Sequence, residues 1–418
     1  MWDDLPTEIS NNILHRLPVK TLIKCTILSK SFLSLITSHD FISTQIAQHT
    51  NSHLLLRYFT NDQQELFHFE PDDETFSGFQ TQGLVNPFPY IPGIWCTVAG
   101  CVNGVICLVD DCGHEGTLTI LWNPSIRKFV EVPEPIMVYE TYGGYESASG
   151  FGFDSISDDY KVVRVVRLLD LGPKFGGTQV EVFSLKSGCW RIIGVGPSYS
   201  IKRRSSEYIP CFLNGSVYWV GSRFVCPNNE NVIVKFDMST ETFEIIQLPG
   251  VVKVSESKYT PILDFYVQEC KGKLALVNRN YKDEIKSCSV WVMKEYGIVE
   301  SWTKIFDFNI DNLSPCGMPR AFGFRKNGEV IMVKGVRRMY TEGEDNVLVS
   351  IDQVTHSETT FRKISADRTS FYLSTYEESM VLFKEGKGIE QQTSQLKSVP
   401  PKKRRFDGEK KSRRKRKN

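Results

Sequence analysis

The fold of this chain is decided by the stretch Leu121-Trp122-Asn123-Pro124-Ser125-Ile126-Arg127-Lys128, which Phe129 completes. An apolar strand ends in an aromatic residue, a polar turn follows, and a second aromatic opens another strand. The unit recurs with the same seven-residue spacing of its aromatics, and two longer versions follow. These further units are Phe69…Phe76, Phe183…Trp190, Phe236…Phe243, Trp291…Trp302 and Ile351…Phe361. Six copies, about 50 to 60 residues apart, indicate a repeat architecture.

The repeat predicts a mainly β fold over residues 50–385. Each unit supplies strands that cannot bury both faces alone, so a ring of neighbouring units is favoured, and six units predict a six-bladed β-propeller. We expect the second aromatic of each unit to be a core wedge between blades. A pair of β-sandwiches is the competing fold, and the sixfold repetition argues against it.

Strand connections are specified by two further patterns. The dipeptides Asn103-Gly104, Asn214-Gly215 and Lys271-Gly272 fit tight hairpin turns. For ring closure we expect the last strands, Ser370–Tyr376 and Ser379–Phe383, to pair with Leu54–Tyr58, because an open ring would leave sheet edges unpaired.

Residues 1–48 carry a helical pattern instead. Ile9, Ile13 and Leu17 recur at four-residue spacing. Pro18 ends this first helix, since it lacks the backbone donor that a helix interior needs. A second helix follows with an apolar side, and a third begins at Ser29 or Ser31. The apolar side of the second helix is Val19, Leu22, Ile23, Thr26 and Ile27. A unit of roughly 45 residues is marginal alone, so it either caps the β domain or offers an apolar surface to a partner.

The residue pattern of 4–42 resembles that of an F-box. Leu5-Pro6 opens it, a middle segment runs from Ile13 to Leu22 as Ile-Leu-His-Arg-Leu-Pro-Val-Lys-Thr-Leu, and Ser29-Lys30-Ser31-Phe32 closes it. F-boxes dock on the adaptor Skp1 of cullin-RING ubiquitin ligases, so the resemblance implies a Skp1-like partner and, through it, a cullin-RING ligase. Carried over by position, the implied Skp1 contacts are Leu5, Pro6, Ile9, Ile13, Leu14, Leu17, Pro18, Leu22 and Cys25. Many F-boxes have Trp where this chain has Phe32, and a large aromatic ring is retained.

Residues 50–385 are similar to the plant F-box-associated interaction domain, whose members are described as kelch-like. The passages that carry the resemblance are 103–108, 121–128, 150–154, 157–163, 182–188, 291–297 and 300–304. The resemblance implies a plant source and a substrate receptor, with the F-box on Skp1 and the β domain on a target protein. The expected layout is a three-helix F-box at 1–48, the interaction domain at 50–385, and a linker with a basic tail at 386–418.

Composition fits a soluble globular protein. Of 418 residues 41% are hydrophobic and 24% charged, and no apolar run is long enough to span a membrane. Eleven cysteines, scattered without a Cys-x-x-Cys pair, favour reduced thiols inside the cell. The local cluster Cys96, Cys101, Cys107 and Cys112 with His114 runs through strand-like sequence, so we expect core packing there, with no metal and no cofactor.

Catalytic motifs are not evident in the sequence. It has no Gly-x-Ser-x-Gly elbow and no phosphate-loop lysine motif. The acidic pairs Asp72-Asp73, Asp110-Asp111 and Asp158-Asp159 are expected in solvated turns. A non-catalytic receptor subunit is therefore predicted, with target contacts on the long connections Pro133–Ser149, Leu169–Thr178, Tyr199–Ile209 and Arg337–Asn346. Lys202-Arg203-Arg204 could favour an acidic target or lie in a solvated loop, and the target protein is not identified.

The tail is strongly basic. Residues 397–418 hold twelve Lys and Arg against Asp407 and Glu409, a net charge of +10 in a chain whose total is +1, so the remainder carries −9. Such like charges stay extended. We expect a nuclear-localisation signal read by an importin, formed by Lys402, Lys403, Arg404, Arg405, Lys410, Lys411, Arg413, Arg414, Lys415 and Arg416. The expected location is the nucleus, with the cytoplasm as a second compartment. Specific nucleic-acid binding is not expected, because Phe406 is the one aromatic residue available for base stacking there.

Three functions follow as hypotheses. The leading one is the substrate-recognition subunit of a Skp1–cullin–F-box (SCF) ubiquitin ligase, which would deliver a target protein for ubiquitination and proteasomal degradation. The second is a β-propeller enzyme or ligand-binding module with an incidental helical cap. The third is a nuclear scaffold acting through the basic tail.

Overall fold

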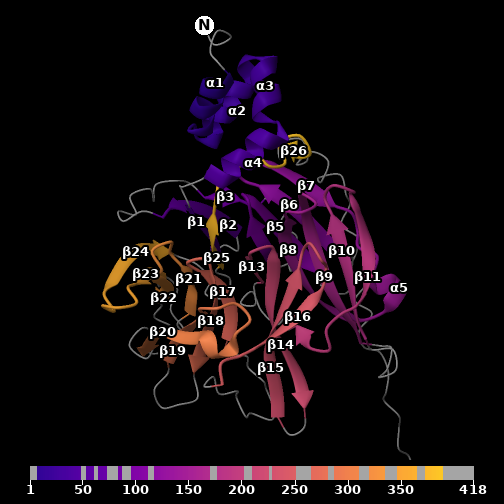
Figure 1. Cartoon of the computed structure of the whole chain (residues 1–418), viewed down its shortest axis with the longest axis vertical. Coiled ribbons are helices and arrows are strands. Elements are labelled where there is room, and N and C mark those ends of the chain that lie inside the picture. Colours follow the sequence, from indigo (N-terminus) through magenta and orange to yellow (C-terminus); the bar gives the residue numbers. More distant parts are fainter. Residues whose placement is uncertain are drawn as a thin grey trace, which may run out of the picture.

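A computed structural model describes most of the chain from residue 7 to residue 388. The described residues are 7–48, 53–60, 65–72, 83–86, 96–111, 117–169, 177–201, 210–225, 228–250, 265–280, 287–309, 320–334, 346–364 and 372–388. Four helices lie together at one end of the molecule, and six β-sheets make up the rest (Figure 1). This confirms the predicted combination of N-terminal helices with a six-bladed propeller.

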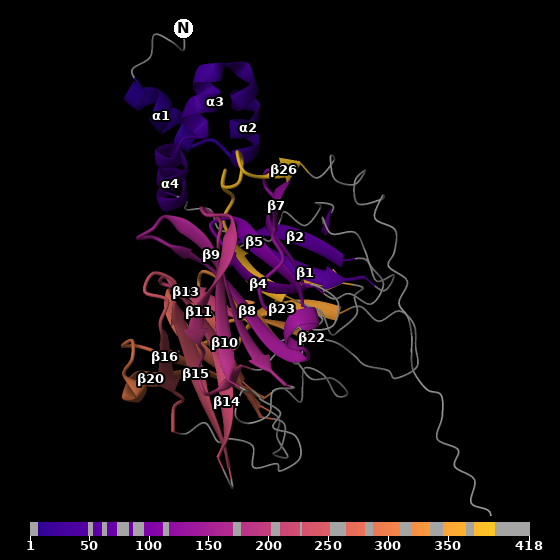
Figure 2. The same cartoon turned by 90° about the vertical axis from the view of Figure 1, so that its right-hand side faces the viewer.

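The helical unit contains one helix more than the sequence predicts. Its helices are α1 (Thr7–His15), α2 (Val19–Leu28), α3 (Lys30–Ile36) and α4 (His39–Gln48). Pro18 stands directly before α2, as expected, and the Ser29 hydroxyl caps α3 by accepting from the Phe32 N–H at 3.1 Å. The apolar residues after α3 form α4, which lies nearest the sheets in both views (Figures 1 and 2).

Each sheet is one blade, and all strand pairs are antiparallel. Blade 1 is β25 (Tyr372–Tyr376), β1 (His53–Phe59), β2 (Glu65–Pro71) and β3 (Leu84–Val85). Blade 2 is β4 (Thr97–Val102), β5 (Val105–Asp111), β6 (Thr117–Asn123), β7 (Lys128–Val132) and β26 (Lys387–Gly388). Blade 3 is β8 (Tyr145–Asp154), β9 (Asp159–Leu168), β10 (Thr178–Ser184) and β11 (Cys189–Val195), and α5 (Tyr139–Tyr142) precedes it.

The second half of the ring follows the same order. Blade 4 is β12 (Ser200–Ile201), β13 (Cys211–Leu213), β14 (Ser216–Val225), β15 (Asn228–Asp237) and β16 (Phe243–Gln247). Blade 5 is β17 (Phe265–Cys270), β18 (Lys273–Asn280), β19 (Ser287–Met293) and β20 (Trp302–Asn309), with the 3₁₀ turn η1 (Val299–Ser301) before β20. Blade 6 is β21 (Arg320–Phe324), β22 (Val330–Lys334), β23 (Asn346–Ile351) and β24 (Glu358–Ile364).

The seven-residue repeat marks the hairpin between the third and fourth strands of a blade. Three aromatic pairs are direct cross-strand partners: Trp122 with Phe129, Phe183 with Trp190, and Phe236 with Phe243. Phe76 lies outside the described residues. The two longer units differ in register from the expectation. η1 lengthens the blade 5 hairpin, so Trp302 faces Met293. In blade 6 Ile351 faces Glu358, again seven residues on, so the pair Ile351…Phe361 is wrong in register.

Tryptophans from these hairpins reach the preceding blade, as the wedge prediction requires. The Trp190 indole N–H donates to the Pro133 carbonyl at 2.8 Å, at the end of blade 2. The Trp302 indole N–H donates to the Gln247 carbonyl of β16, in blade 4, at 3.3 Å. Both rings are buried, at 8% and 7% exposure. Each wedge therefore combines apolar burial with one polar tie between blades.

The predicted hairpin turns are confirmed by their backbone angles. Asn103 and Gly104 have φ of 50° and 76°, and Asn214-Gly215 and Lys271-Gly272 repeat these values within a few degrees. Two successive positive φ angles define the turn that matches strand twist.

Of the two strands predicted to close the ring, one is confirmed and one is wrong. β25 pairs with β1, so residues near the C-terminus supply the innermost strand of blade 1. Ser379–Phe383 forms no strand, so that part of the prediction is wrong. The segment turns away from blade 1, and the next strand, β26, adds to β7 of blade 2.

The propeller has two unlike faces. Turns that join first to second and third to fourth strands lie on the helix side: Asn103 and Asn123 bond the C-terminal segment, and Asp158 bonds α4. Because antiparallel strands alternate in direction, the remaining connections leave from the opposite face.

Candidate functional site

Exposed apolar side chains gather on the three helices that lie farthest from the propeller. Ile9 and Ile13 of α1 are 49% and 39% exposed, and Leu33 of α3 is 40% exposed. At the end of α2 Ile27 and Leu28 reach 81% and 74%. We refer to these five residues as the apolar docking surface. Large aliphatic side chains left in water on a small helical unit favour burial against a partner.

The predicted Skp1 contacts fall into different environments. Ile9, Ile13 and Pro18 are exposed, whereas Leu14 and Leu22 are buried. The other described members, Leu17 and Cys25, are half-buried and pack against the core. Leu5 and Pro6 lie outside the described residues. The assignment of these residues as Skp1 contacts stays a prediction.

Sequence reasoning missed the most exposed part of this surface. The predicted apolar side of the second helix includes Ile27, but in the structure this residue is 81% exposed and lies apart from the buried side of α2. Val19, Leu22 and Thr26 alone make the buried side of α2. The signal was available in the helical period, because Ile27 follows Thr26 by one residue and so points about 100° away from it.

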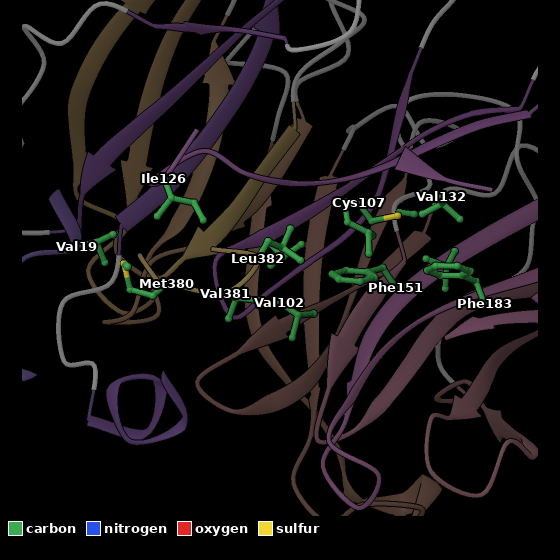
Figure 3. Packing of buried hydrophobic residues seen from close by; sticks show 14 of the residues in the cluster. Val19, Val102, Cys107, Ile126, Val132, Phe151, Phe183, Met380, Val381 and Leu382 are labelled. Atoms are coloured by element: carbon green, nitrogen blue, oxygen red, sulfur yellow. The ribbon is translucent and has the colours of Figure 1, made fainter. Parts of the chain in front are cut away.

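The helices are attached to blades 2 and 3 by a shared core. Val19 of α2 belongs to the same buried cluster as Cys107 of blade 2 and Phe151 of blade 3 (Figure 3). Leu14, Leu22 and Phe41 belong to that cluster too. A polar link lies at its rim, where the His39 Nε2 of α4 is 2.6 Å from the Asp158 Oδ2. That hydrogen bond raises the pKa of the His39 imidazole above its ordinary value.

On the opposite face, one of the predicted target-binding connections is described. Within Pro133–Ser149, the backbone N–H groups of Ile136 and Met137 donate to the Glu181 carboxylate at 3.0 and 3.1 Å, and Glu181 is paired with buried Arg164. The connection is thus anchored on blade 3 while Ile136 and Tyr139 remain 41% and 42% exposed. Leu169–Thr178, Tyr199–Ile209 and Arg337–Asn346 lie largely outside the described residues, as does Lys202-Arg203-Arg204.

The described cysteines and acidic residues take part in packing and in ion pairs within the propeller. Cys101 lies in the core, where burial raises the pKa of its thiol to about 12. Within the described part of the chain no group of three or more His, Cys, Asp or Glu side chains could hold a metal ion. Cys112 and His114 are outside that part. Asp72 departs from the predicted solvated turn, since it is buried and bonds the Arg325 Nε of blade 6 at 2.9 Å.

A buried ionic network ties blade 3 to blade 4 on the helix side. The Lys161 Nζ donates to the Asp154 Oδ2 at 2.8 Å, to the Met238 carbonyl at 2.8 Å and to the Glu241 Oε1 at 3.0 Å. Burial acts to raise the pKa of Asp154, but hydrogen bonds from Lys161, Ser157 and Ser239 outweigh it and hold that pKa well below its ordinary value. The Lys161 ammonium therefore links the β8–β9 hairpin of blade 3 to the β15–β16 turn of blade 4.

Known families match both parts of the chain. The F-box domain matches residues 2–44, and the F-box associated beta propeller domain matches residues 40–370. F-box protein CPR1 of Arabidopsis thaliana is 32% identical over 328 residues, 72% of each chain. F-box protein At4g22390 of the same plant is 31% identical, covering 72% of this chain and 73% of its own.

The chain is also similar to solved β-propeller structures, at lower sequence identity than to the plant proteins. The β-propeller domain of the Trilobed protease from Pyrococcus furiosus is 12% identical, with a TM-score of 0.36, covering 81% of this chain and 91% of that one. Among the described helices, none is long and apolar enough to cross a membrane.

The matches cover the helical unit and the propeller in the order in which the structure places them. The chain belongs to the family of plant F-box proteins that carry an F-box associated β-propeller domain.

Proposed function

We propose that this protein is the substrate-recognition subunit of an SCF ubiquitin ligase. The F-box binds a Skp1-like adaptor, and through it a cullin-RING ligase, while the propeller holds a target protein for ubiquitination and proteasomal degradation. The apolar docking surface on α1–α3, within a segment that matches the F-box family, is the observation that carries the proposal.

Burial of this surface supplies the driving force for adaptor binding. Fully burying a Leu or Ile side chain is worth about 1.5–3 kcal/mol, and a few such anchors dominate a typical interface. Ile27 and Leu28 have most to gain, since they are exposed by 81% and 74%. The target is assigned to the opposite face, where Ile136 and Tyr139 are presented on an anchored connection.

The chain itself carries out no bond-making step in this proposal. Its contribution is proximity, because holding target and ligase in one assembly converts an encounter in solution into a reaction within a complex. The arrangement supports this, since the adaptor-facing helices and the far connections occupy opposite ends of the propeller.

Adaptor binding is tested by co-purification of the full chain with a plant Skp1-like adaptor. Ile27→Glu/Leu28→Glu should lower the affinity at least about tenfold, since two buried anchors would become charged. Leu5→Ala/Pro6→Ala/Leu17→Ala tests the predicted contacts separately.

The matched control is Ile156→Glu/Val354→Glu. These side chains are 83% and 86% exposed on propeller turns, so the control adds the same charge outside the F-box. Absence of wild-type binding to the adaptor would refute the proposal and favour a β-propeller binding module or enzyme, or a nuclear scaffold. If the wild-type chain binds the adaptor, proximity labelling from the full chain with the proteasome blocked is the experiment that identifies the target.

We propose in addition that the basic tail directs nuclear import through an importin, with some protein in the cytoplasm. The support is the density of charge in residues 402–417. Deleting residues 400–418 from a fluorescent fusion should move it out of the nucleus. A second variant, with Lys410, Lys411 and the following basic residues replaced by Ser, tests the second basic cluster while the first is kept. An unchanged nuclear signal in both variants would refute the assignment.

A further inference from the structure

Residues 377–388, which we call the strap, connect the innermost strand of blade 1 to the outer edge of blade 2. The strap leaves β25, which pairs with β1, and ends in β26, which pairs with β7. β26 lies close to the helices in both views (Figures 1 and 2). The segment that closes the ring therefore also passes the F-box.

The strap is part of the core that the helices share with the propeller. Met380, Val381 and Leu382 are buried, at 0%, 7% and 2% exposure. Figure 3 shows Met380 beside Val19 of α2 and Ile126 of blade 2, within one buried cluster. The strap therefore contributes, with blades 2 and 3, to the apolar core on which the F-box packs.

The Asn123 side chain fixes the strap backbone. Its amide N–H₂ group donates to the Ser379 carbonyl at 3.0 Å and to the Val381 carbonyl at 2.9 Å, and the residue is fully buried. Its Oδ1 accepts from the Ser125 N–H at 3.0 Å and holds the β6–β7 turn. Both ends of the amide are thus used, one for the turn and one for the strap.

Other blades show why the residue is an asparagine. The same place in blade 4 is Asp237 and in blade 6 Asp352, and each accepts two turn N–H groups through its carboxylate. An acceptor is all that the turn requires, and a carboxylate supplies it. In blade 3 the same place is Ser184, whose hydroxyl accepts from the Ser187 N–H and donates its single proton to Asp159. Only in blade 2, among the described blades, does the side chain at this place donate to the strap, and an amide can give both N–H₂ protons to strap carbonyls while its oxygen accepts.

Further contacts hold the strap in one conformation. The Ser379 hydroxyl donates to the Asn103 carbonyl at 2.6 Å, and the Lys128 Nζ donates to the Phe383 carbonyl while lying 4.5 Å from that ring's centroid. Leu382 has φ of +68°, a conformation that costs a non-glycine residue energy and persists where the surroundings impose it.

We propose that Asn123 and the strap are positioning elements that set the orientation of the F-box on the propeller. The orientation of helices α1–α4 on the propeller depends on the Asn123 amide and on closure of the ring by residues 372–388. If the SCF function proposed above holds, the same contact sets where the ligase stands relative to a bound target, which decides the lysines that ubiquitin reaches.

The test is Asn123→Asp in the full chain, compared with wild type by hydrogen exchange. Aspartate keeps the acceptor for the Ser125 N–H but places a carboxylate against two carbonyl oxygens. Amides of α4 and of the strap should exchange faster by on the order of tenfold, with blades 4 and 5 unchanged. Asp352→Asn is the matched control and should leave exchange in α4 as in wild type.

An exchange pattern equal to wild type, or acceleration confined to the β6–β7 turn, would overturn the proposal. If Asn123→Asp yields little folded protein, Ser379→Ala is the second variant. It removes the bond to the Asn103 carbonyl and the hydroxyl oxygen that accepts from the Asn123 amide and the Val381 N–H, but keeps both backbone carbonyl bonds of Asn123, so it should show the same pattern more weakly.

A second readout separates positioning from loss of stability. In a reconstituted ligase, ubiquitin added to the chain's own lysines can be mapped by mass spectrometry. Asn123→Asp should spread ubiquitin over more lysines while adaptor affinity stays within about twofold, since the apolar docking surface is unaltered. A uniform fall at the same lysines would indicate destabilisation alone and overturn positioning. Failure of wild type to bind the adaptor would remove the proposed function and leave the exchange comparison intact.

Discussion

The imidazole of His39 and the carboxylate of Asp158 meet across the boundary between F-box and propeller, with Nε2 2.6 Å from Oδ2. His39 opens α4, and Asp158 lies in the β8–β9 turn with φ of 53°. The other groups close to the imidazole are the Asp40 carboxylate at 3.5 Å from Nδ1 and the Ser43 hydroxyl at 3.3 Å from Nε2. The boundary thus carries one titratable link among these described groups.

This link should make the junction tighter at mildly acidic pH. The hydrogen bond to Asp158, followed by that to Asp40, raises the pKa of His39 above 6.5. Stabilisation is therefore fully present below about pH 6.5 and lost as the pH rises through the higher folded-state pKa. Because the pair is exposed, we expect less than about 1 kcal/mol. NMR titration of His39 should give a pKa that falls in Asp158→Asn, and an unchanged pKa in that variant would contradict the assignment.

Gly104 should tolerate a methyl group less well than glycines in equivalent turns. Its φ is +76°, and an added Cβ would lie 2.5 Å from the Glu377 carbonyl oxygen and 2.6 Å from the Ser379 Oγ. Gly215 and Gly272 have φ of 74° and 71° with nothing within 4 Å. The control substitutions Gly215→Ala and Gly272→Ala should each cost about 1 kcal/mol of backbone strain.

Gly104→Ala should lower the free energy of unfolding by about 2 kcal/mol more than these controls, because it adds a clash with the strap. Urea unfolding measures the difference. Equal losses in all three variants would show that the strap does not press on this turn.

Removing the cation at Lys161 should strongly destabilise the propeller. Lys161→Met leaves the buried Asp154 carboxylate without its positive partner, whereas Glu241 keeps its pair with Arg191. Breaking a buried pair in this way costs about 3 kcal/mol. Lys304→Met is the matched control: its pair with Asp307 is exposed, so the loss should stay below about 1 kcal/mol. Similar losses in the two variants, measured by urea unfolding, would contradict the network's role.

The stabilisation that Trp190 gives to the propeller should consist of a large contribution from apolar packing and a smaller one from its hydrogen bond. Trp190→Phe keeps a large ring but loses the bond to the Pro133 carbonyl, at a cost of about 1 kcal/mol. Trp190→Ala should cost about 3–5 kcal/mol, since it opens a cavity between blades 2 and 3. Thermal unfolding of both variants checks the order, and a larger loss in Trp190→Phe would be inconsistent with a wedge held mainly by packing.

Much of the propeller could be predicted because its signals are local. The spacing from Trp122 to Phe129 is the length of one hairpin, and Asn103-Gly104 specifies a turn through its own backbone preferences. In blade 5 the predicted register failed because η1 lengthens the hairpin, so Trp302 faces Met293. In blade 6 the hairpin keeps the seven-residue spacing, but its second position is Glu358 and not an aromatic residue, so the prediction took Phe361, three residues too far along. The spacing of Pro18 and Ser29 likewise set the limits of α2 and α3.

The docking surface could be predicted only in part. The sequence shows that α1–α3 have more apolar residues than a small unit can bury, but it does not show which of them lose contact with water. Leu14 and Leu22 are covered because the propeller and the strap pack against that side, whereas Ile27 and Leu28 face away from both. That choice depends on contacts with residues hundreds of positions away.

By itself the sequence determined the repeat, the class of fold and the helical docking module, because hydrophobic period, turn residues and helix caps act over a few neighbouring residues. The tertiary structure decided where the helices are mounted. Ser379–Phe383 reads as one more apolar strand, yet the donors of Asn123, 256 residues earlier, bind its backbone carbonyls and draw it under the F-box. Hydrogen bonds and packing between such distant segments exist only once the ring has closed.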